Sequence, residues 1–241
     1  MSEVWAIVPA RAGSKGVPDK NIRNLAGHPL LAWSVRAGLK AGNISRVFIS
    51  TDSERYAEIA KAYGAEAPFL RPSDLASDVS PDFGFMEHAV NWFLAHEGTV
   101  ADYFVHLRPT TPLREAAVVA AGVDAMRAAE SATALRSVHE MAESAYKTFE
   151  ICDGALKQVG GTGGALDAAN AARQGYPKTY AANGYVDVVR TQLIRQRRLL
   201  HGERVAGFVT PAVVEVDVPD DFDHLEYQVA RRGDLVRALF G

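Results

Sequence analysis

The most informative segment of this sequence is Ile7-Val8-Pro9-Ala10-Arg11-Ala12-Gly13-Ser14-Lys15-Gly16-Val17-Pro18-Asp19-Lys20-Asn21. It begins inside a short apolar run, residues 4–8, which predicts a first β-strand. Two glycines and three cations follow that strand: Arg11, Gly13, Lys15, Gly16 and Lys20. Glycine adopts positive φ angles at little cost, and the backbone N–H groups of such a loop form a concave site for anions. The segment therefore predicts a strand that leads into a polyphosphate-binding loop.

This loop matches neither of the two commonest phosphate motifs. The P-loop requires G-x-x-x-x-G-K-[ST] and the dinucleotide fingerprint requires G-x-G-x-x-G, and the sequence contains neither pattern. A tight basic turn on the protein surface is the alternative interpretation, and the loop by itself does not separate the two.

The length fits one large α/β domain or two small ones, and we expect a single domain over residues 1–241. Of the 241 residues, 48% are hydrophobic and 23% are charged, which is typical of a protein with a full core. The net charge of -3 argues against general nucleic-acid binding, because that function leaves a basic footprint.

Other features predict a cytoplasmic protein that does not enter a membrane. No apolar run approaches the roughly 20 residues needed to cross a bilayer. The sequence enters its first strand without the basic and apolar regions of a signal peptide. Cys152 is the single cysteine, so no internal disulfide is expected, in agreement with a reducing compartment.

Strand-like and helix-like segments alternate over the first 140 residues. Strands are expected at residues 4–8, 46–50, 103–107 and 132–138, and helices at 30–39, from Ser53 to about Tyr63, from Pro81 or Asp82, and at 116–126. This alternation predicts a mostly parallel sheet with helices on both faces. Ligands bind beyond the carboxyl ends of such strands, where the basic loop and Asp52 are expected.

Residues 140–182 break this alternation, and we expect a loop or an excursion that packs on a partner. Regular structure is predicted again at the strands 184–189, 205–209 and 213–218. A last helix follows, with Pro219 at its first position and an apolar stripe formed by Phe222, Leu225 and Val229.

Two carboxylates near the C-terminus are candidates for a metal site. Glu215 and Asp217 lie two residues apart in the strand predicted at 213–218, so their side chains are expected on one face. Carboxylate oxygens are ligands that Mg²⁺ prefers. The alternative is that acidic residues here only cap the following helix, as we expect for Asp220 and Asp221.

Three arginines in turn-like contexts are candidates for anion contacts. Arg71 precedes Pro72. Arg108 and Arg114 follow the strand predicted at 103–107, so we expect both to point to the binding edge of the sheet. The guanidinium fork matches carboxylate and phosphate geometry, but a surface ion pair would explain each arginine equally well. The seven histidines show no zinc-ligand spacing, and no G-x-S-x-G nucleophile elbow is present.

Taken together and in order, the motifs resemble those of the CMP-sialic acid synthetases (acylneuraminate cytidylyltransferases) over roughly residues 3–230. The motifs are Ala10-Arg11-Ala12-Gly13-Ser14-Lys15-Gly16 with Lys20-Asn21, Ser50-Thr51-Asp52, Leu70-Arg71-Pro72 with Leu75-Ala76-Ser77-Asp78, Pro109-Thr110-Thr111-Pro112-Leu113-Arg114, Asn183-Gly184 and Val216-Asp217-Val218-Pro219-Asp220-Asp221. The resemblance implies a Rossmann-like nucleotidyltransferase fold of the GT-A type, and a homodimer formed through an excursion at about 140–182. It also implies transfer of CMP from CTP to a nine-carbon 2-keto sugar acid of the sialic, legionaminic or pseudaminic type, with release of pyrophosphate.

The resemblance further implies roles for individual residues. Contacts to the triphosphate are expected from Arg11, Gly13, Ser14, Lys15 and Lys20, and contacts that place the nucleotide from Asn21 and Arg71. Asp217 and Glu215 would hold Mg²⁺, and Arg11, Lys20 and the metal would stabilise the transition state, since phosphoryl transfer depends on positioning and charge neutralisation. The sugar acid would meet Arg108, Asp187, Lys147 and Arg173, with the lysine reaching across from the partner subunit.

The sequence departs from the family pattern around the sugar. Arg108 stands where many sialic acid enzymes have Gln, and Asp187 replaces an aromatic hydroxyl in Asn183-Gly184-Tyr185-Val186-Asp187. Asp82 lies in a region that runs beside the base in the family. Because Arg108 would also suit a phosphate, the alternatives are a nucleotidyltransferase that uses a sugar 1-phosphate, with GTP as a candidate donor, and a non-catalytic nucleotide-binding module.

Overall fold

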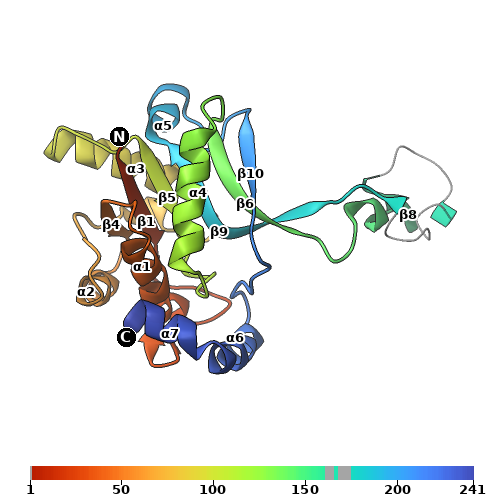
Figure 1. Ribbon diagram of the computed structural model, residues 1–241, viewed down its shortest axis with the longest axis horizontal. Helices are drawn as coiled ribbons and strands as arrows, with labels where there is room; N and C mark the ends of the chain where they lie inside the picture. Colours follow the sequence, from red (N-terminus) through yellow and green to blue (C-terminus); the bar gives the residue numbers. More distant parts are fainter. Residues whose placement is uncertain (1, 161–165, 168–174) are drawn as a thin grey trace.

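A computed structural model describes residues 2–160, 166–167 and 175–241, and within them the chain forms a six-stranded sheet in the order β10-β6-β9-β5-β1-β4 (Figure 1). Its strands are β1 (Val4–Pro9), β4 (Arg46–Ser50), β5 (Tyr103–His106), β6 (Ala134–Glu140), β9 (Tyr180–Arg190) and β10 (Val205–Val209). Strand β9 is antiparallel to β5 and β6, and the other neighbouring pairs are parallel. The predicted mostly parallel sheet is confirmed.

Helices cover both faces of this sheet, also as predicted. They are α1 (Leu30–Lys40), α2 (Glu54–Ala62), α3 (Asp82–His96), α4 (Ala116–Ala128) and α5 (Thr191–Arg197). Alternate side chains of β1 point to opposite faces: Trp5 and Ile7 join a core with α3, whereas Ala6 and Val8 join a core with α1, α2 and α4. Ser53 caps α2 by accepting a hydrogen bond from the backbone N–H of Tyr56.

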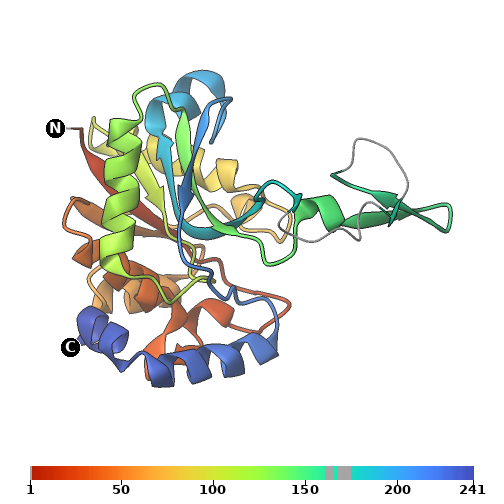
Figure 2. The ribbon, with the colours of Figure 1, turned by 45° about the vertical axis from the view of Figure 1, so that its right-hand side comes forward.

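A third core lies under the C-terminal helices α6 (Pro219–Arg231) and α7 (Gly233–Phe240), which pack below the sheet near α1 (Figure 2). It joins Phe222 and Leu225 of α6 with Val17, Trp33 and Val216. Helix α6 begins at Pro219 as predicted, but α7 was not expected from the sequence. We call residues 215–217, with Glu215 and Asp217, the acidic segment. Because Val17 and Val216 are both buried in this third core, they attach the basic loop and the acidic segment to one apolar cluster.

The strand predicted at residues 213–218 is wrong. In the part of the chain that the structure describes, this segment belongs to no β-sheet; the Val216 N–H donates instead to the Thr110 carbonyl at 2.8 Å. Its neighbour is therefore the loop after β5 and not a strand. The expected alternation nevertheless remains: Val216 is buried, and Glu215 and Asp217 are exposed beside it.

Residues 140–160 and 175–180 leave the sheet as a projection, which we call the arm (Figures 1 and 2). Within its described part, β6 and β9 lead outward to the hairpin of β7 (Phe149–Cys152) and β8 (Ala155–Gln158). The short elements of the chain are β2 (Asn24–Leu25), β3 (His28–Pro29) and the 3₁₀ turns η1 (Lys20–Ile22), η2 (Ser73–Leu75) and η3 (Ala145–Lys147). Among the described residues, none of the helices has the length and apolar character needed to cross a membrane.

Candidate active site

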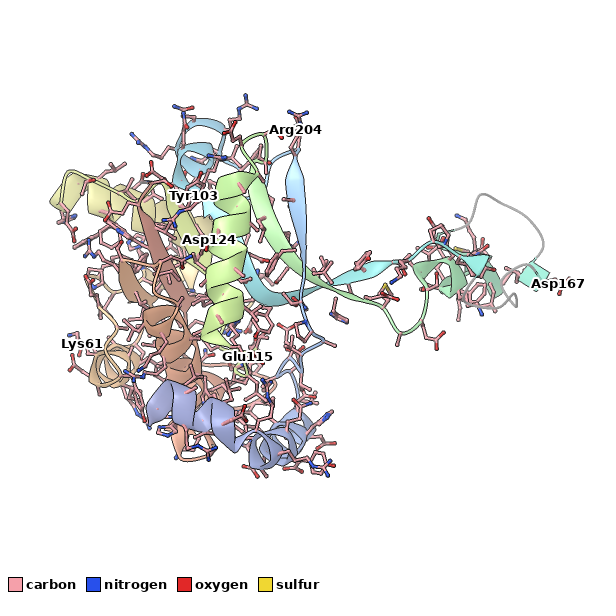
Figure 3. All side chains as sticks on the ribbon, viewed as in Figure 1. Lys61, Tyr103, Glu115, Asp124, Asp167 and Arg204 are labelled. Carbon is pink, nitrogen blue, oxygen red and sulfur yellow. The ribbon has the colours of Figure 1, made fainter. Side chains whose placement is uncertain are left out.

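A cleft of about 220 Å³ lies at the carboxyl ends of the parallel strands. Figure 3 marks the two ends of the sheet, with Tyr103 at the start of β5 and Glu115 beyond the loop that follows it. The lining combines the predicted basic loop with the segment between α2 and α3, the start of α3, and the end of β5 with the loop after it. The residues are Pro9, Arg11, Ser14, Lys20, Asn21, Arg71, Leu75, Ser77, Asp78, Ser80, Asp82, Phe85, His106, Arg108, Pro109 and Thr110. The expected edge of the sheet therefore does carry the cleft.

Internal hydrogen bonds hold the basic loop in shape. Gly13 has φ of 70°, in the region that favours glycine. The backbone N–H of Ala12 donates to Asp52 Oδ1 at 2.8 Å, and Asn21 Nδ2 donates to the Arg11 carbonyl at 2.9 Å. Asp52 and Asn21 thus fix the backbone of the loop at Arg11 and Ala12. Asn21 also lines the cleft.

The cations of the loop already have a carboxylate partner. Asp78 pairs with Arg11, and its Oδ2 lies 2.7 Å from Lys15 Nζ. The hydrogen bond from Lys15, together with Arg11, lowers the pKa of Asp78, so this carboxylate stays charged. Asp78 thus occupies the two cations, Arg11 and Lys15, that an incoming anion would also contact.

Lys20 connects the basic loop to the acidic segment. Its ammonium donates to the Val216 carbonyl at 2.7 Å and lies 3.5 Å from Asp217 Oδ1. Gly16 makes this approach possible, because a Cβ at that residue would lie 2.7 Å from the Asp217 carbonyl oxygen. The Lys20 ammonium thus lies beside the Asp217 carboxylate, and the Gly16 backbone lies against the Asp217 carbonyl.

The acidic segment is fixed at both ends. Glu215 accepts a hydrogen bond from Thr110 Oγ1 at 3.1 Å. Asp221, in the first turn of α6, accepts the backbone N–H groups of Asp217 at 2.7 Å and Val218 at 2.8 Å. These backbone bonds, chiefly that of Val218, lower the pKa of Asp221, and its predicted capping role is confirmed.

The donor set at Glu215 and Asp217 fits a hard cation that keeps much of its water. Both groups supply carboxylate oxygens, and the Asp217 side chain is 75% exposed. In the described ranges no group of three or more His, Cys, Asp or Glu side chains is arranged to hold a metal. Two carboxylates can therefore contribute part of a coordination shell, with the remainder left to substrate and water.

Arg71 is buried in the cleft wall without a carboxylate contact. Its Nε donates to Ser50 Oγ at 3.0 Å and its second nitrogen to the Ser50 carbonyl at 2.6 Å. The guanidinium lies 4.6 Å from the centre of the Phe85 ring. Burial lowers the pKa of Arg71 to about 10. The surface ion pair considered from the sequence is not what holds this side chain.

The expectation that Arg114 points to the binding edge is wrong. Its side chain is fully buried, and the guanidinium donates to the carbonyls of Tyr185, Gly184 and Arg108 and to Ser34 Oγ. Burial lowers its pKa to about 9. The fork matches backbone carbonyls as well as anions, and here it joins α1, β9 and the loop after β5.

Arg108 does line the cleft, where two carboxylates hold it. One nitrogen donates to Asp187 Oδ2 at 2.9 Å and the other to Asp82 Oδ2 at 3.0 Å. Burial alone lowers the pKa of Arg108, but the two carboxylates outweigh burial and raise it. Asp187 is only 1% exposed and lies behind the guanidinium, so it reaches the cleft through Arg108.

Sequence reasoning missed His106. It ends β5 opposite Asp187 and is buried in the cleft wall against Phe85. Burial, followed by the charges of Arg108 and Arg114, lowers its pKa well below the ordinary value, so the ring is neutral. Its place at the end of a predicted buried strand was the available signal.

Of the two predicted arm residues, Lys147 is described, and within one chain it does not reach the cleft. Lys147 lies on the arm, with Nζ 6.0 Å from the centre of the Tyr176 ring, and it does not line the cleft. Arg173 lies outside the described residues.

A mostly parallel sheet with a cationic glycine loop after its first strand, beside an acidic segment, is typical of the nucleotidyltransferase class of α/β fold. A solved structure of CMP:2-keto-3-deoxy-manno-octonic acid synthetase complexed with CTP matches with a TM-score of 0.71 over 95% of this chain and 99% of that chain. At 16% identity this match establishes the fold alone.

Sequence comparison identifies the family. The model of the cytidylyltransferase family matches residues 5–150, and the chain belongs to this family. Over 114 residues it is 40% identical to an N-acylneuraminate cytidylyltransferase of Escherichia coli, covering 47% of this chain and 26% of that protein. Over 118 residues it is 39% identical to a CMP-N,N'-diacetyllegionaminic acid synthase of Legionella pneumophila, covering 46% and 48%. The chain thus matches less than half the length of either relative, and the resemblance to the CMP-sialic acid synthetases is confirmed.

Proposed function

We propose that this protein transfers CMP from CTP to a nine-carbon 2-keto sugar acid and releases pyrophosphate. The observation that carries the proposal is the contact of Lys20 and Gly16 with Asp217, which places exposed carboxylates directly beside the cationic loop of the cleft. The acceptor class is supported by the relatives, whose names specify N-acylneuraminate and diacetyllegionaminic acid.

In the proposed reaction the anomeric hydroxyl oxygen of the acid forms a bond to the α-phosphorus of CTP. The bond from that phosphorus to the bridging oxygen breaks, pyrophosphate leaves with the electron pair, and the hydroxyl loses its proton. Arg11, Lys15 and Lys20 neutralise the phosphates, and backbone N–H groups near Gly13 and Ser14 bind their oxygens. Catalysis then depends on charge and position, as is general for phosphoryl transfer.

Magnesium is part of this proposal. Asp217 and Glu215 would hold it, and a bound divalent ion would supply Lewis-acid stabilisation of the phosphate charge. Lys20 already neutralises Asp217 at 3.5 Å, so the lysine and the metal would share one carboxylate.

Arg108 no longer favours a sugar 1-phosphate over a sugar acid. An extra cation in the cleft motivated that alternative, but this guanidinium is engaged by Asp187 and Asp82 at about 3 Å. A phosphate would have to displace Asp82 and would still face Asp187. We therefore assign Arg71 and Asn21 to the nucleotide and the wall around Arg108 to substrate selection.

We also propose that the arm forms a homodimer and carries Lys147 to the partner's cleft, and that Arg173 contacts the sugar acid. Support comes from the apolar side chains that the described part of the arm exposes, including Ile151 at 76% and Leu156 at 52%. Exposed apolar groups gathered on one projection are typical of an interaction surface.

The test is a panel of CTP, GTP and UTP against nine-carbon sugar acids and sugar 1-phosphates, read by pyrophosphate release. We expect turnover with CTP and a sugar acid. Turnover only with a sugar 1-phosphate would eliminate this function in favour of the second nucleotidyltransferase class. Tight CTP binding without turnover of any acceptor would indicate a binding module.

A further inference from the structure

Two carboxylates, Asp78 and Asp82, line a cleft that is otherwise cationic, and they are held in different ways. Asp78 pairs with Arg11 and Lys15, the cations proposed to meet phosphate. Asp82 is the first residue of α3, and its Oδ2 accepts from Arg108 at 3.0 Å. A polyphosphate would replace Asp78 on its cations, whereas Asp82 has no such competitor.

The position of Asp82 is fixed through buried groups. Arg108 joins it to Asp187, which is 1% exposed and accepts the backbone N–H of Ser137 at 3.2 Å through its other oxygen. Arg136 Nε lies 3.8 Å from the same Asp187 carboxylate. Two guanidinium groups thus face two carboxylates, and they hold Asp82 at the start of α3.

The second oxygen of Asp82 faces a different environment. The side chain is 43% exposed, and among residues 2–160, 166–167 and 175–241 no hydrogen bond is made to Oδ1. A carboxylate oxygen only accepts hydrogen bonds. In a cleft for an anionic ligand it opposes binding unless the ligand brings a donor to it.

We propose that Asp82 is a specificity-determining acceptor for an N–H group of the bound substrates, with Arg108 and Asp187 as positioning residues. The inference rests on the proposed function. Two parts of those substrates offer this chemistry: the exocyclic amine of the nucleobase and the amide N–H of an acylamino sugar acid. The two sources are distinguished by which binding constant the variant changes.

The test compares Asp82→Ala with wild-type enzyme by calorimetric titration of CTP and UTP and by the KM for N-acetylneuraminate. UTP lacks the exocyclic amine, so loss of a base contact reduces the preference for CTP over UTP by about tenfold or more and leaves the acceptor KM unchanged. Loss of a sugar contact raises the acceptor KM by a similar factor and leaves both nucleotide affinities unchanged. Asp74→Ala is the matched control, since Asp74 is exposed in the preceding segment and does not line the cleft.

Arg108→Gln tests the positioning role. We expect it to change the same constant as Asp82→Ala by a smaller factor, and a change in a different constant would overturn that role. The proposal fails if Asp82→Ala leaves the CTP preference and the acceptor KM within twofold of wild type. It also fails if all three constants worsen equally together with a lower melting temperature, since that outcome marks a structural residue. Absence of wild-type turnover with every nine-carbon acid counts instead against the proposed function.

Discussion

The cleft and the arm differ in how their side chains are satisfied by the rest of the chain. In the cleft, polar groups from distant segments satisfy one another, as when Lys20 donates to the Val216 carbonyl 196 residues away. In the described part of the arm, the hairpin pairs only with itself, and its apolar side chains Ile151 and Leu156 face solvent. The difference teaches that the groups we propose for nucleotide binding meet within one chain, whereas the described part of the arm exposes apolar side chains that suit the proposed contact with a second subunit.

The largest expected effect removes the group that joins the two walls of the cleft. Lys20→Ala should lower kcat by roughly 10²–10³, the range for losing one charged donor to a transition state. Steady-state pyrophosphate release measures this, with Lys40→Ala, at the exposed end of α1, as the control. Activity within a few-fold of wild type would remove Lys20 from the mechanism.

The second effect concerns the arm alone. Ile151→Lys should weaken self-association on the order of 100-fold, because a charge would be buried in an apolar interface. Light scattering after gel filtration measures the mass over a range of concentrations. Tyr227→Lys, at a 58% exposed residue of α6, is the control on the body of the protein. A wild-type protein that is monomeric at all concentrations would contradict the expected dimer.

A smaller effect tests the internal anion of the cleft. Asp78→Asn should tighten CTP binding by about threefold to tenfold, because the phosphates would no longer compete with this carboxylate for Arg11 and Lys15. Calorimetry on this variant and on Asp74→Asn gives the comparison. Weaker binding in Asp78→Asn would mean that the carboxylate contributes to the bound state and does not compete with the phosphates.

The smallest effect is on stability and depends on pH. The pKa of Asp221 in the folded protein is below its ordinary value of 3.8, so its stabilisation is present above that pH and is lost as pH falls through the lowered value. Asp221→Ala should therefore cost about 1 kcal/mol at neutral pH and little in strong acid. Urea denaturation at both pH values, with the exposed Asp223→Ala in the same helix as control, measures the difference. An equal loss at both pH values would contradict the capping role.

Much of the body was predictable because its signals are local. Apolar runs identified β1, β4 and β5, and helical spacing placed α1 at 30–39 against the observed Leu30–Lys40. The prediction of a strand at 213–218 was wrong because alternation of apolar and polar residues indicates which side chains are buried. It does not indicate whether a neighbouring strand is present.

The site was predictable only in part, for a related reason. Residue type and order placed Arg11, Lys20 and Asp217 together, and the structure confirms that the last two meet. Pairings between segments carry no local signal, so the partners of Asp78 and Arg108 were out of reach. Arg114 shows the same limit, since a guanidinium that binds backbone carbonyls has no distinctive neighbour in sequence.

Gly16 has a consequence for how this cleft can change over evolution. With only a hydrogen atom at that residue, the backbone of the basic loop touches the Asp217 carbonyl. The separation between the basic loop and the acidic segment therefore depends on the absence of a side chain at Gly16. A methyl group at this residue would push the basic loop away from the acidic segment. The attraction between Lys20 and Asp217 would weaken as their separation grows.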